Sequence, residues 1–170
     1  MKLQRLKISV TWKIIISIAL VKLIIHLIIS NNYELHRDAY LYLAQSDHLA
    51  WGYASVPPSI AFFGKLITSL FGYSAISVRL LPALLGSTSV IFIGLIVKEL
   101  KGKNTAIFIA CLAFLLSPAY LRTNSLFQPV VFNQFLWLLS GYFIIRLIKT
   151  YKTQYWIILF IIWGFAFMNK

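Results

Sequence analysis

Three of the chain's four acidic side chains, Glu34, Asp38 and Asp47, lie within fourteen residues of one another, directly after a long apolar segment. A carboxylate can accept a proton, as a general base does. Arg37 stands beside Asp38. The clustering predicts a functional site at a membrane surface, with Asp38 as its first candidate.

Each of these residues also has a purely structural interpretation. Asp38 could be only a helix N-cap, with its carboxylate on free backbone amides. Glu34 could be an interfacial charge paired with Arg37, and Asp47 could belong to a solvated helix face. Lys65 could anchor an amphipathic helix to lipid phosphates. At each position the sequence leaves both interpretations open.

The composition indicates a membrane protein. Hydrophobic residues make up 60% of the sequence and charged residues 12%, whereas soluble domains are about half apolar and about a quarter charged. The single cysteine, Cys111, lies in an apolar run, which excludes a disulfide framework and a thiolate metal site. The net charge of +12 does not indicate nucleic acid as a partner, because the basic residues form no cluster on a polar face.

Apolar segments predict an all-α, multi-pass protein. A spanning helix needs about 20 mainly apolar residues, because every backbone polar group must be paired within the helix once it lies in lipid. We expect four complete spans and a fifth that the end of the sequence cuts off, at residues 12–30, 76–97, 105–121, 127–148 and 155–170.

The cations predict the orientation of these spans. Three groups of Lys and Arg residues fall on the same side of the membrane if successive spans alternate in direction. Cytoplasmic loops of membrane proteins carry an excess of Lys and Arg. The groups are Lys2, Arg5, Lys7 and Lys13, then Lys98, Lys101 and Lys103, then Arg146, Lys149 and Lys152. We therefore expect a cytoplasmic N-terminus, a first span retained as an anchor, and an extracytoplasmic segment at residues 31–75.

This outer segment, residues 31–75, is too apolar for a flexible loop. The sequence predicts two helices in it, at residues 38–51 and 59–71, ended by Gly52 and Gly72. Pro57 and Pro58 force an extended stretch between them, and Pro58 suits the first turn of the second helix. Both helices are too short to span the membrane, so we expect them to lie along its surface and to hold Asp38 there.

Lys22 and His26 lie well inside the first span, four residues apart on one helical face. Ionisable residues in lipid are unfavourable and usually face protein or a watery cavity. We therefore expect both to face protein. They also leave open that the protein is a small transporter with a proton or ion pathway, which is the least favoured of the functions that we consider.

Several motifs occur together in the outer segment and the later spans. They are Tyr-Glu-Leu-His-Arg-Asp (33–38), Trp-Gly-Tyr-Ala-Ser-Val-Pro-Pro (51–58), Val-Arg-Leu-Leu-Pro-Ala-Leu-Leu-Gly (78–86), Ser-Pro-Ala-Tyr-Leu-Arg (117–122) and Leu-Phe-Gln-Pro-Val-Val-Phe-Asn-Gln-Phe-Leu-Trp (126–137). In their order and sidedness the chain resembles the lipid-linked-sugar glycosyltransferases of the dolichyl-phosphate-mannose protein mannosyltransferase type, to which the bacterial aminoarabinose transferases of lipid A are similar.

The resemblance implies a GT-C-type N-terminal transmembrane module that carries out sugar transfer. The donor would be a sugar on a polyprenyl phosphate, the acceptor a hydroxyl group of a glycan, lipid or protein, and the reaction would invert the anomeric carbon. Asp38 matches the family's catalytic base. Arg37, Lys65 and Arg122 would serve the donor phosphate, with Glu34 as a further substrate contact. A bacterial inner or plasma membrane is the expected location.

The chain also departs from the family's pattern. Ala39 replaces a common glutamate, Val56 a common His or Lys, and Gln128 and Asn133 stand where an acid is expected near Pro129. With so few carboxylates a divalent metal is not favoured, and we expect no cofactor. The departures leave a second function open, a non-catalytic or degenerate membrane subunit. We further expect the 170 residues to be an incomplete fragment without activity in isolation.

Overall fold

The computed structural model describes residues 9–169 and shows only helices in that part of the chain. They are α1 (Val10–Ile29), α2 (Arg37–Asp47), α3 (Ser59–Phe71), α4 (Ala75–Glu99), α5 (Asn104–Leu116), α6 (Pro118–Thr123), α7 (Pro129–Thr150) and α8 (Gln154–Phe167). The prediction of an all-α membrane protein is thus confirmed.

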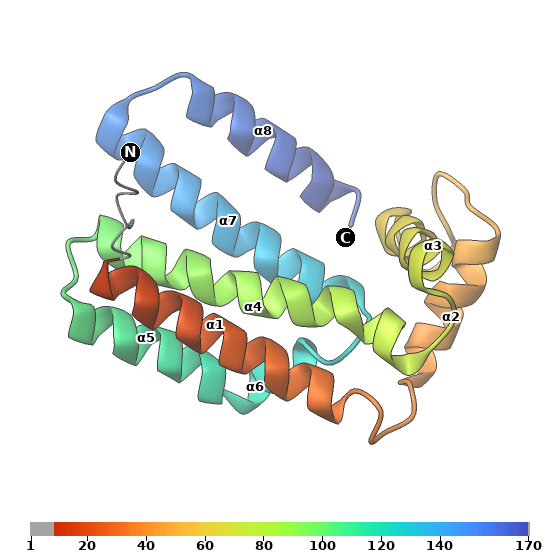
Figure 1. The fold of residues 1–170 in the computed structure, drawn as a ribbon. Helices are drawn as coiled ribbons and strands as arrows, with labels where there is room; N and C mark the ends of the chain where they lie inside the picture. The colour runs from red at the N-terminus through yellow and green to blue at the C-terminus, as the bar shows by residue number, and fades with distance from the viewer. Residues whose placement is uncertain (1–8, 170) are drawn as a thin grey trace, which may run out of the picture.

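α4 forms the centre of a helical bundle (Figure 1). It packs against α1, α5 and α7, while α8 lies along the other side of α7. Helices α1, α4 and α7, with 20, 25 and 22 residues, are long and apolar enough to cross a membrane. α2 and α3 pack against each other beyond one end of the bundle, which we call the outer end.

Two of the expected spans are shorter helices in the structure. The segment 105–121 divides into α5 and α6, because Ser117 has an extended backbone with ψ 119° before Pro118. Proline disfavours helical backbone in the residue before it and suits the first turn of a new helix. α8 has 14 residues, or about 21 Å at 1.5 Å per residue.

The two short helices of the outer segment form, with one boundary changed. α3 follows the predicted bounds and ends at Gly72, whose φ of 73° favours glycine. α2 ends at Asp47 instead of residue 51. The Tyr53 hydroxyl donates to the carbonyls of Gln45 and His48, so it ties the following loop to the end of α2.

The N-cap of α2 is His36, so the interpretation of Asp38 as the cap is wrong. The His36 ring nitrogen Nδ1 accepts a hydrogen bond from the backbone amide of Asp38 at 3.3 Å. Asp38 lies in the first turn, where the helix dipole favours a negative charge. Its carboxylate is therefore free for other partners.

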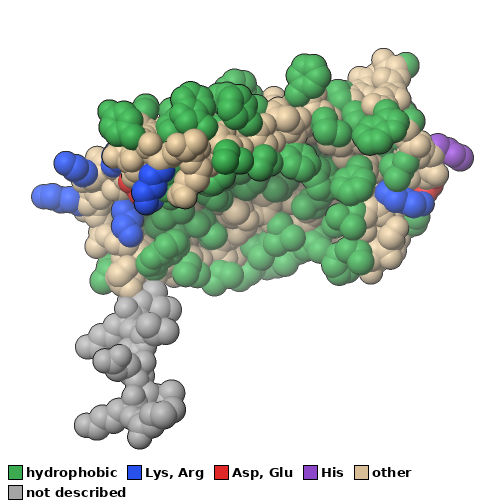
Figure 2. Space-filling model, turned by 90° about the horizontal axis from the view of Figure 1, so that it is seen from above, with side chains coloured by type: hydrophobic (Ala, Val, Ile, Leu, Met, Phe, Trp, Pro, Cys, Tyr) green, Lys and Arg blue, Asp and Glu red, His purple; other side chains and the backbone are tan. Residues whose placement is uncertain are grey.

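Charged side chains gather at the two ends of the molecule, and hydrophobic side chains cover the middle (Figure 2). At the end opposite α2 and α3, which we call the inner end, Glu99 accepts a hydrogen bond from Arg146 at 2.7 Å and lies 3.4 Å from Lys149. Arg146 also donates to the Tyr155 hydroxyl at 2.8 Å. This cluster joins α4, α7 and α8.

Lys22 and His26 face protein, as expected. Their exposed fractions are 0% and 3%, and the Lys22 ammonium lies 4.8 Å from the centre of the Phe114 ring. Neither side chain has a hydrogen-bond partner among the described residues. The first span therefore carries two polar groups into the bundle between α1, α4 and α5.

Candidate functional site

The loop that follows α1 is held by Arg79 of α4. The Arg79 guanidinium is buried and donates to the backbone carbonyls of Ser30, Tyr33 and Glu34, the last two at 2.8 and 2.6 Å. Three carbonyls without helical partners are thus satisfied by one charged side chain. Arg79 thus holds the loop on α4 up to Glu34, two residues before the N-cap of α2, His36.

Asp38 meets three side chains from two distant parts of the chain. Its Oδ1 lies 3.3 Å from Nε of Arg37, and its Oδ2 accepts a hydrogen bond from Nε2 of Gln128 at 3.0 Å. Nδ1 of His36 lies 3.5 Å from the same Oδ2. Each carboxylate oxygen offers about two lone pairs, so both oxygens can still accept a proton or a hydrogen bond.

Asp38 opens into a small pocket of about 250 Å³, which we call the acid pocket. It is lined by Asp38, Tyr42, Ser55, Val56, Pro57, Gln128, Pro129, Val130 and Asn169. Burial, together with the negative charge of Asp38, raises the pKa of the Tyr42 phenol. Tyr42 therefore stays neutral at physiological pH and offers a hydroxyl donor one helical turn from Asp38.

The other predicted site residues do not all meet Asp38. Only Arg37 lies beside it, with a side chain that is 91% exposed. Lys65 lies 3.8 Å from Asp47 on the other side of α2 and α3. Glu34 and Arg122 line a separate pocket, which is described below.

Gln128, His36 and Tyr42 join the site without having been assigned a role from the sequence. Gln128 attracted attention only because an acid was expected near it. The useful signal was the Gln-Pro pair at the start of an apolar segment, because a residue just before Pro at a helix start has an extended backbone. Gln128 indeed has φ −145° and ψ 154°.

The structure shows where three of the departures from the family's pattern lie. Ala39 is 1% exposed in an outer hydrophobic core with Leu43 and Ile60, so it does not line the acid pocket. Asn133 lines other pockets, on the far side of α7. Val56, in contrast, forms part of the acid pocket's wall.

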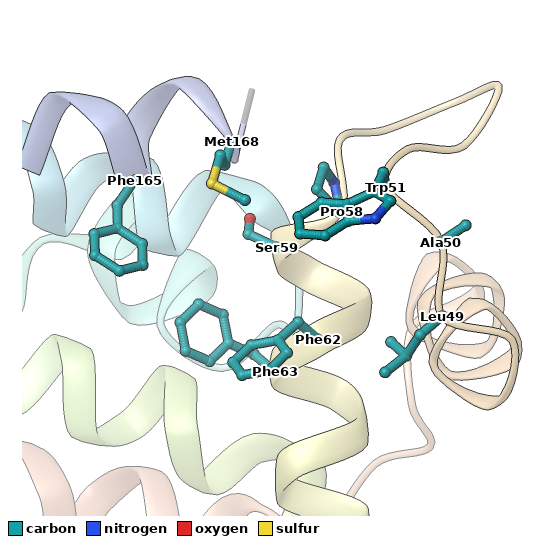
Figure 3. Close-up of a pocket in the computed structure, with 9 residues that line it drawn as sticks. All are labelled: Leu49, Ala50, Trp51, Pro58, Ser59, Phe62, Phe63, Phe165 and Met168. Carbon is teal, nitrogen blue, oxygen red and sulfur yellow. The ribbon is translucent and has the colours of Figure 1, made fainter. Parts of the chain in front are cut away.

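An apolar groove lies next to the acid pocket (Figure 3). This Trp51 groove has a volume of about 430 Å³ and is lined by Leu49, Ala50, Trp51, Pro58, Ser59, Phe62, Phe63, Phe165 and Met168. Ser59 and Asn169 separate it from the acid pocket, since their side chains share a hydrogen bond of 3.1 Å. Asn169 also donates to the Pro129 carbonyl at 2.9 Å.

Within residues 9–169 the structure brings together no three His, Cys, Asp or Glu side chains that could hold a metal ion. The acid pocket contains one carboxylate, that of Asp38, with the His36 ring beside it. Divalent cations that prefer oxygen ligands usually bind to several charged groups, whereas the acid pocket offers one carboxylate. Independence from metal stays a prediction.

Comparison with known proteins identifies the family to which the chain belongs. A family model described as dolichyl-phosphate-mannose-protein mannosyltransferase matches residues 55–170. No curated protein and no solved structure matches the chain significantly. The matched residues include Val56 and Gln128 of the acid pocket but begin after Asp38. Because the match covers more than half of the sequence, the chain belongs to the dolichyl-phosphate-mannose-protein mannosyltransferase family of membrane glycosyltransferases.

Proposed function

We propose that the protein transfers a sugar from a polyprenyl-phosphate carrier to an acceptor hydroxyl group, with inversion, on the outer face of the membrane. The observation that carries this proposal is the acid pocket. It holds a carboxylate with free lone pairs at the end of a membrane bundle, within a chain of a mannosyltransferase family. The carrier, the acceptor, the stereochemistry and the membrane side are parts of the proposal.

Asp38 serves as the general base in this proposal. The acceptor oxygen forms a bond to the anomeric carbon, the bond from that carbon to the phosphate oxygen breaks, and the hydroxyl proton passes to the Asp38 carboxylate. Gln128 holds Oδ2 through its amide N–H, which fixes the direction of the carboxylate. Arg37 is the nearest cation that can balance charge on the leaving phosphate.

The Trp51 groove suits the lipid part of such a donor. A polyprenyl chain is apolar and has no hydrogen-bonding groups, and the side chains of Phe62, Phe63, Phe165 and Met168 offer it a matching surface (Figure 3). Only the hydrogen-bonded side chains of Ser59 and Asn169 separate the groove from the acid pocket. A carrier chain in the groove would therefore bring its phosphate and sugar towards Asp38.

The decisive experiment measures sugar transfer by the protein at its natural length. The Asp38→Asn variant is therefore introduced into the gene at its own chromosomal locus. Membranes receive a short-chain polyprenyl phosphate that bears a radiolabelled hexose or pentose. We expect label to move from acid-labile lipid into an acid-stable product, with the opposite anomeric configuration. Asp38→Asn should abolish this movement.

Two outcomes would contradict the proposal. Transfer that survives Asp38→Asn would remove Asp38 from the chemistry. Binding of the donor without any transfer that depends on Asp38 would favour the non-catalytic subunit, a function that the apolar Val56 in the pocket wall supports.

The side of the membrane has its own test. Single cysteines at Asn32 and Ser55, in a chain with Cys111→Ala, should react with an impermeant thiol reagent in intact cells. A cysteine at Asn104, at the opposite end of the bundle, should react only after the cells are opened. Reaction at Asn104 but not at Asn32 would place the acid pocket on the cytoplasmic face and overturn the proposed direction of transfer.

A further inference from the structure

A second pocket, which several polar side chains line, lies beside the acid pocket and is separated from it by the His36 ring. This His26 pocket has a volume of about 670 Å³ and is walled by the outer end of α1, the loop after it and the segment from α6 to Leu126. His36 contributes to its wall, while Nδ1 of the same ring faces Asp38 and Gln128. Nothing in the proposed transfer reaction uses this pocket.

Two buried side chains in its wall have no partner among the described residues. His26 is 3% exposed, and neither of its ring nitrogens has a hydrogen bond. Asn124 is 2% exposed, and its Oδ1 has no hydrogen bond either. Nearly all buried polar atoms in proteins are paired, and leaving one unpaired is unfavourable. The pocket is therefore built to receive a polar group.

The space for Asn124 is made by Gly86 of α4. A Cβ atom at position 86 would lie only 2.6 Å from Cγ of Asn124 and 2.7 Å from its Oδ1. The amide thus packs directly on the α4 backbone. Because Oδ1 is the amide atom nearest Gly86, the N–H₂ group of Asn124 is the end of the amide that can serve as a donor.

The charge around the His26 pocket is predominantly positive. Arg79 and Arg122 both line it, and Lys22 lies one helical turn from His26, about 6 Å away by the geometry of such pairs. Lys22 is fully buried, and its ammonium contacts only the face of the Phe114 ring. These cations call for a negative partner.

The protein supplies little negative charge there. Glu34 lines the pocket and is the acid nearest to these cations. The chain's other three acidic side chains do not line this pocket, and two of them, Asp47 and Glu99, are paired with Lys65 and Arg146. An anion from outside the described residues is the partner that would balance the pocket.

We propose that the His26 pocket binds a phosphate group. His26, Arg122 and the Nε2–H of His36 can donate to different oxygens of a tetrahedral anion, which matches phosphate better than a planar carboxylate. The His36 proton is on Nε2 in the neutral ring, because Nδ1 accepts from the Asp38 amide. Ile29 and Leu126 in the same wall accommodate an apolar substituent, so the group comes either from free phosphate or from a lipid headgroup.

Binding is measured by calorimetry on the protein purified in a phosphate-free maltoside detergent. The probes are inorganic phosphate, dihexanoyl phosphatidic acid and dihexanoylglycerol. Saturable binding of phosphatidic acid that exceeds that of inorganic phosphate supports a lipid headgroup, and the reverse order supports free phosphate. Equal binding of dihexanoylglycerol and phosphatidic acid, or binding of none of the three, overturns the proposal.

Variants locate the binding. Arg122→Gln removes an exposed charge without disturbing the bundle and should weaken phosphate binding at least about tenfold, because a charge-assisted hydrogen bond is lost. His26→Leu, which preserves the volume, should do the same. Lys65→Gln removes a cation from the same end of the molecule but outside the pocket, and should leave the affinity unchanged.

The same measurement separates this proposal from the proposed transfer. Asp38→Asn should keep phosphate binding, because Asp38 does not line the His26 pocket. Unchanged binding in Arg122→Gln, or equal loss in Lys65→Gln, would show that phosphate binds elsewhere and would refute the assignment. Neither result depends on a sugar donor or on catalysis.

Discussion

Glu99 at the inner end and Asp38 at the outer end are two carboxylates of one bundle with opposite surroundings. Glu99 lies 2.7 Å from a guanidinium nitrogen of Arg146 and 3.4 Å from the ammonium of Lys149. Asp38 has a neutral amide, Gln128, and one highly exposed cation, Arg37. Two nearby cations balance the charge of Glu99. The Gln128 amide orients Asp38 but leaves most of its charge unbalanced.

This difference supports the proposed role of Asp38 as a general base and a structural role for Glu99. Two close cations hold Glu99 as an anion whose oxygens are occupied, and the cluster fastens α4 to α7 and α8. Asp38 is held through a hydrogen bond that leaves its charge and part of its lone pairs available in a pocket. A general base needs the second kind of environment.

The largest expected effect is on catalysis at Asp38. Asp38→Asn should lower the transfer rate at least about 100-fold, the lower range for loss of a general base. The protein's abundance in the membrane should stay near normal, because His36 and not Asp38 caps α2. The rate is measured with a labelled donor in membranes of matched protein content.

Asp47→Asn is the matched control, since Asp47 lies on the same helix but bonds to Tyr73 and Lys65. Its transfer rate should equal that of the unaltered protein. A similar fall in both variants would mean that the acids of α2 act only through general charge, and the contrast between Asp38 and Glu99 would disappear.

The second effect is on stability at Glu99. Glu99→Gln should lower the free energy of unfolding by about 1 to 2 kcal/mol, because the ion pair with Arg146 becomes a hydrogen bond from Arg146 to a neutral amide oxygen. Thermal unfolding in detergent measures the change, and the transfer rate per folded molecule should not move. A loss of activity without a loss of stability would show that Glu99 has a chemical role after all.

A smaller effect is expected at Gln128, which orients Asp38. Gln128→Ala should lower the transfer rate about three- to tenfold, the equivalent of one hydrogen bond of about 1 kcal/mol. Gln134→Ala, which removes an amide that accepts from Thr123 instead, is the comparison. Equal rates for the two variants would mean that the bond to Gln128 does not position the base.

The smallest effect on the transfer rate is expected from removing divalent metal ions with a chelator. Transfer should be unchanged by EDTA, because the acid pocket offers one carboxylate and one histidine ring instead of a set of charged ligands. Loss of activity that Mg²⁺ or Mn²⁺ restores would contradict this and would make Asp38 a ligand as well as a base.

Apolar length alone was enough to locate the long helices. α1, α4 and α7 follow continuous hydrophobic segments, and Gly72 ends α3 where the sequence indicates. The division of α5 from α6 was harder to see, because apolar residues continue on both sides of Ser117 and only Pro118 marks the break. Hydropathy averages over such a position.

The candidate site was only partly predictable, because its contacts join distant residues. Asp38 and Gln128 are 90 positions apart, and no local pattern connects them. The role of Arg79 comes from three loop carbonyls that a sequence cannot place. Lys65 and Arg122 have the right charge for a phosphate site, but the packing of α3 and α6 takes them away from Asp38.

The hydrogen bond between Asp38 and Gln128 also sets an order of events during biogenesis. Chains are made from the N-terminus at about 5 to 20 residues per second, so the 90 positions between these residues correspond to about 5 to 20 s. Over that interval Asp38 is already part of the chain, while the Gln128 amide that bonds to it has yet to be synthesised. The proposed arrangement of Asp38 and Gln128 therefore forms only after the start of α7 has been made, and on our proposal transfer cannot begin before then.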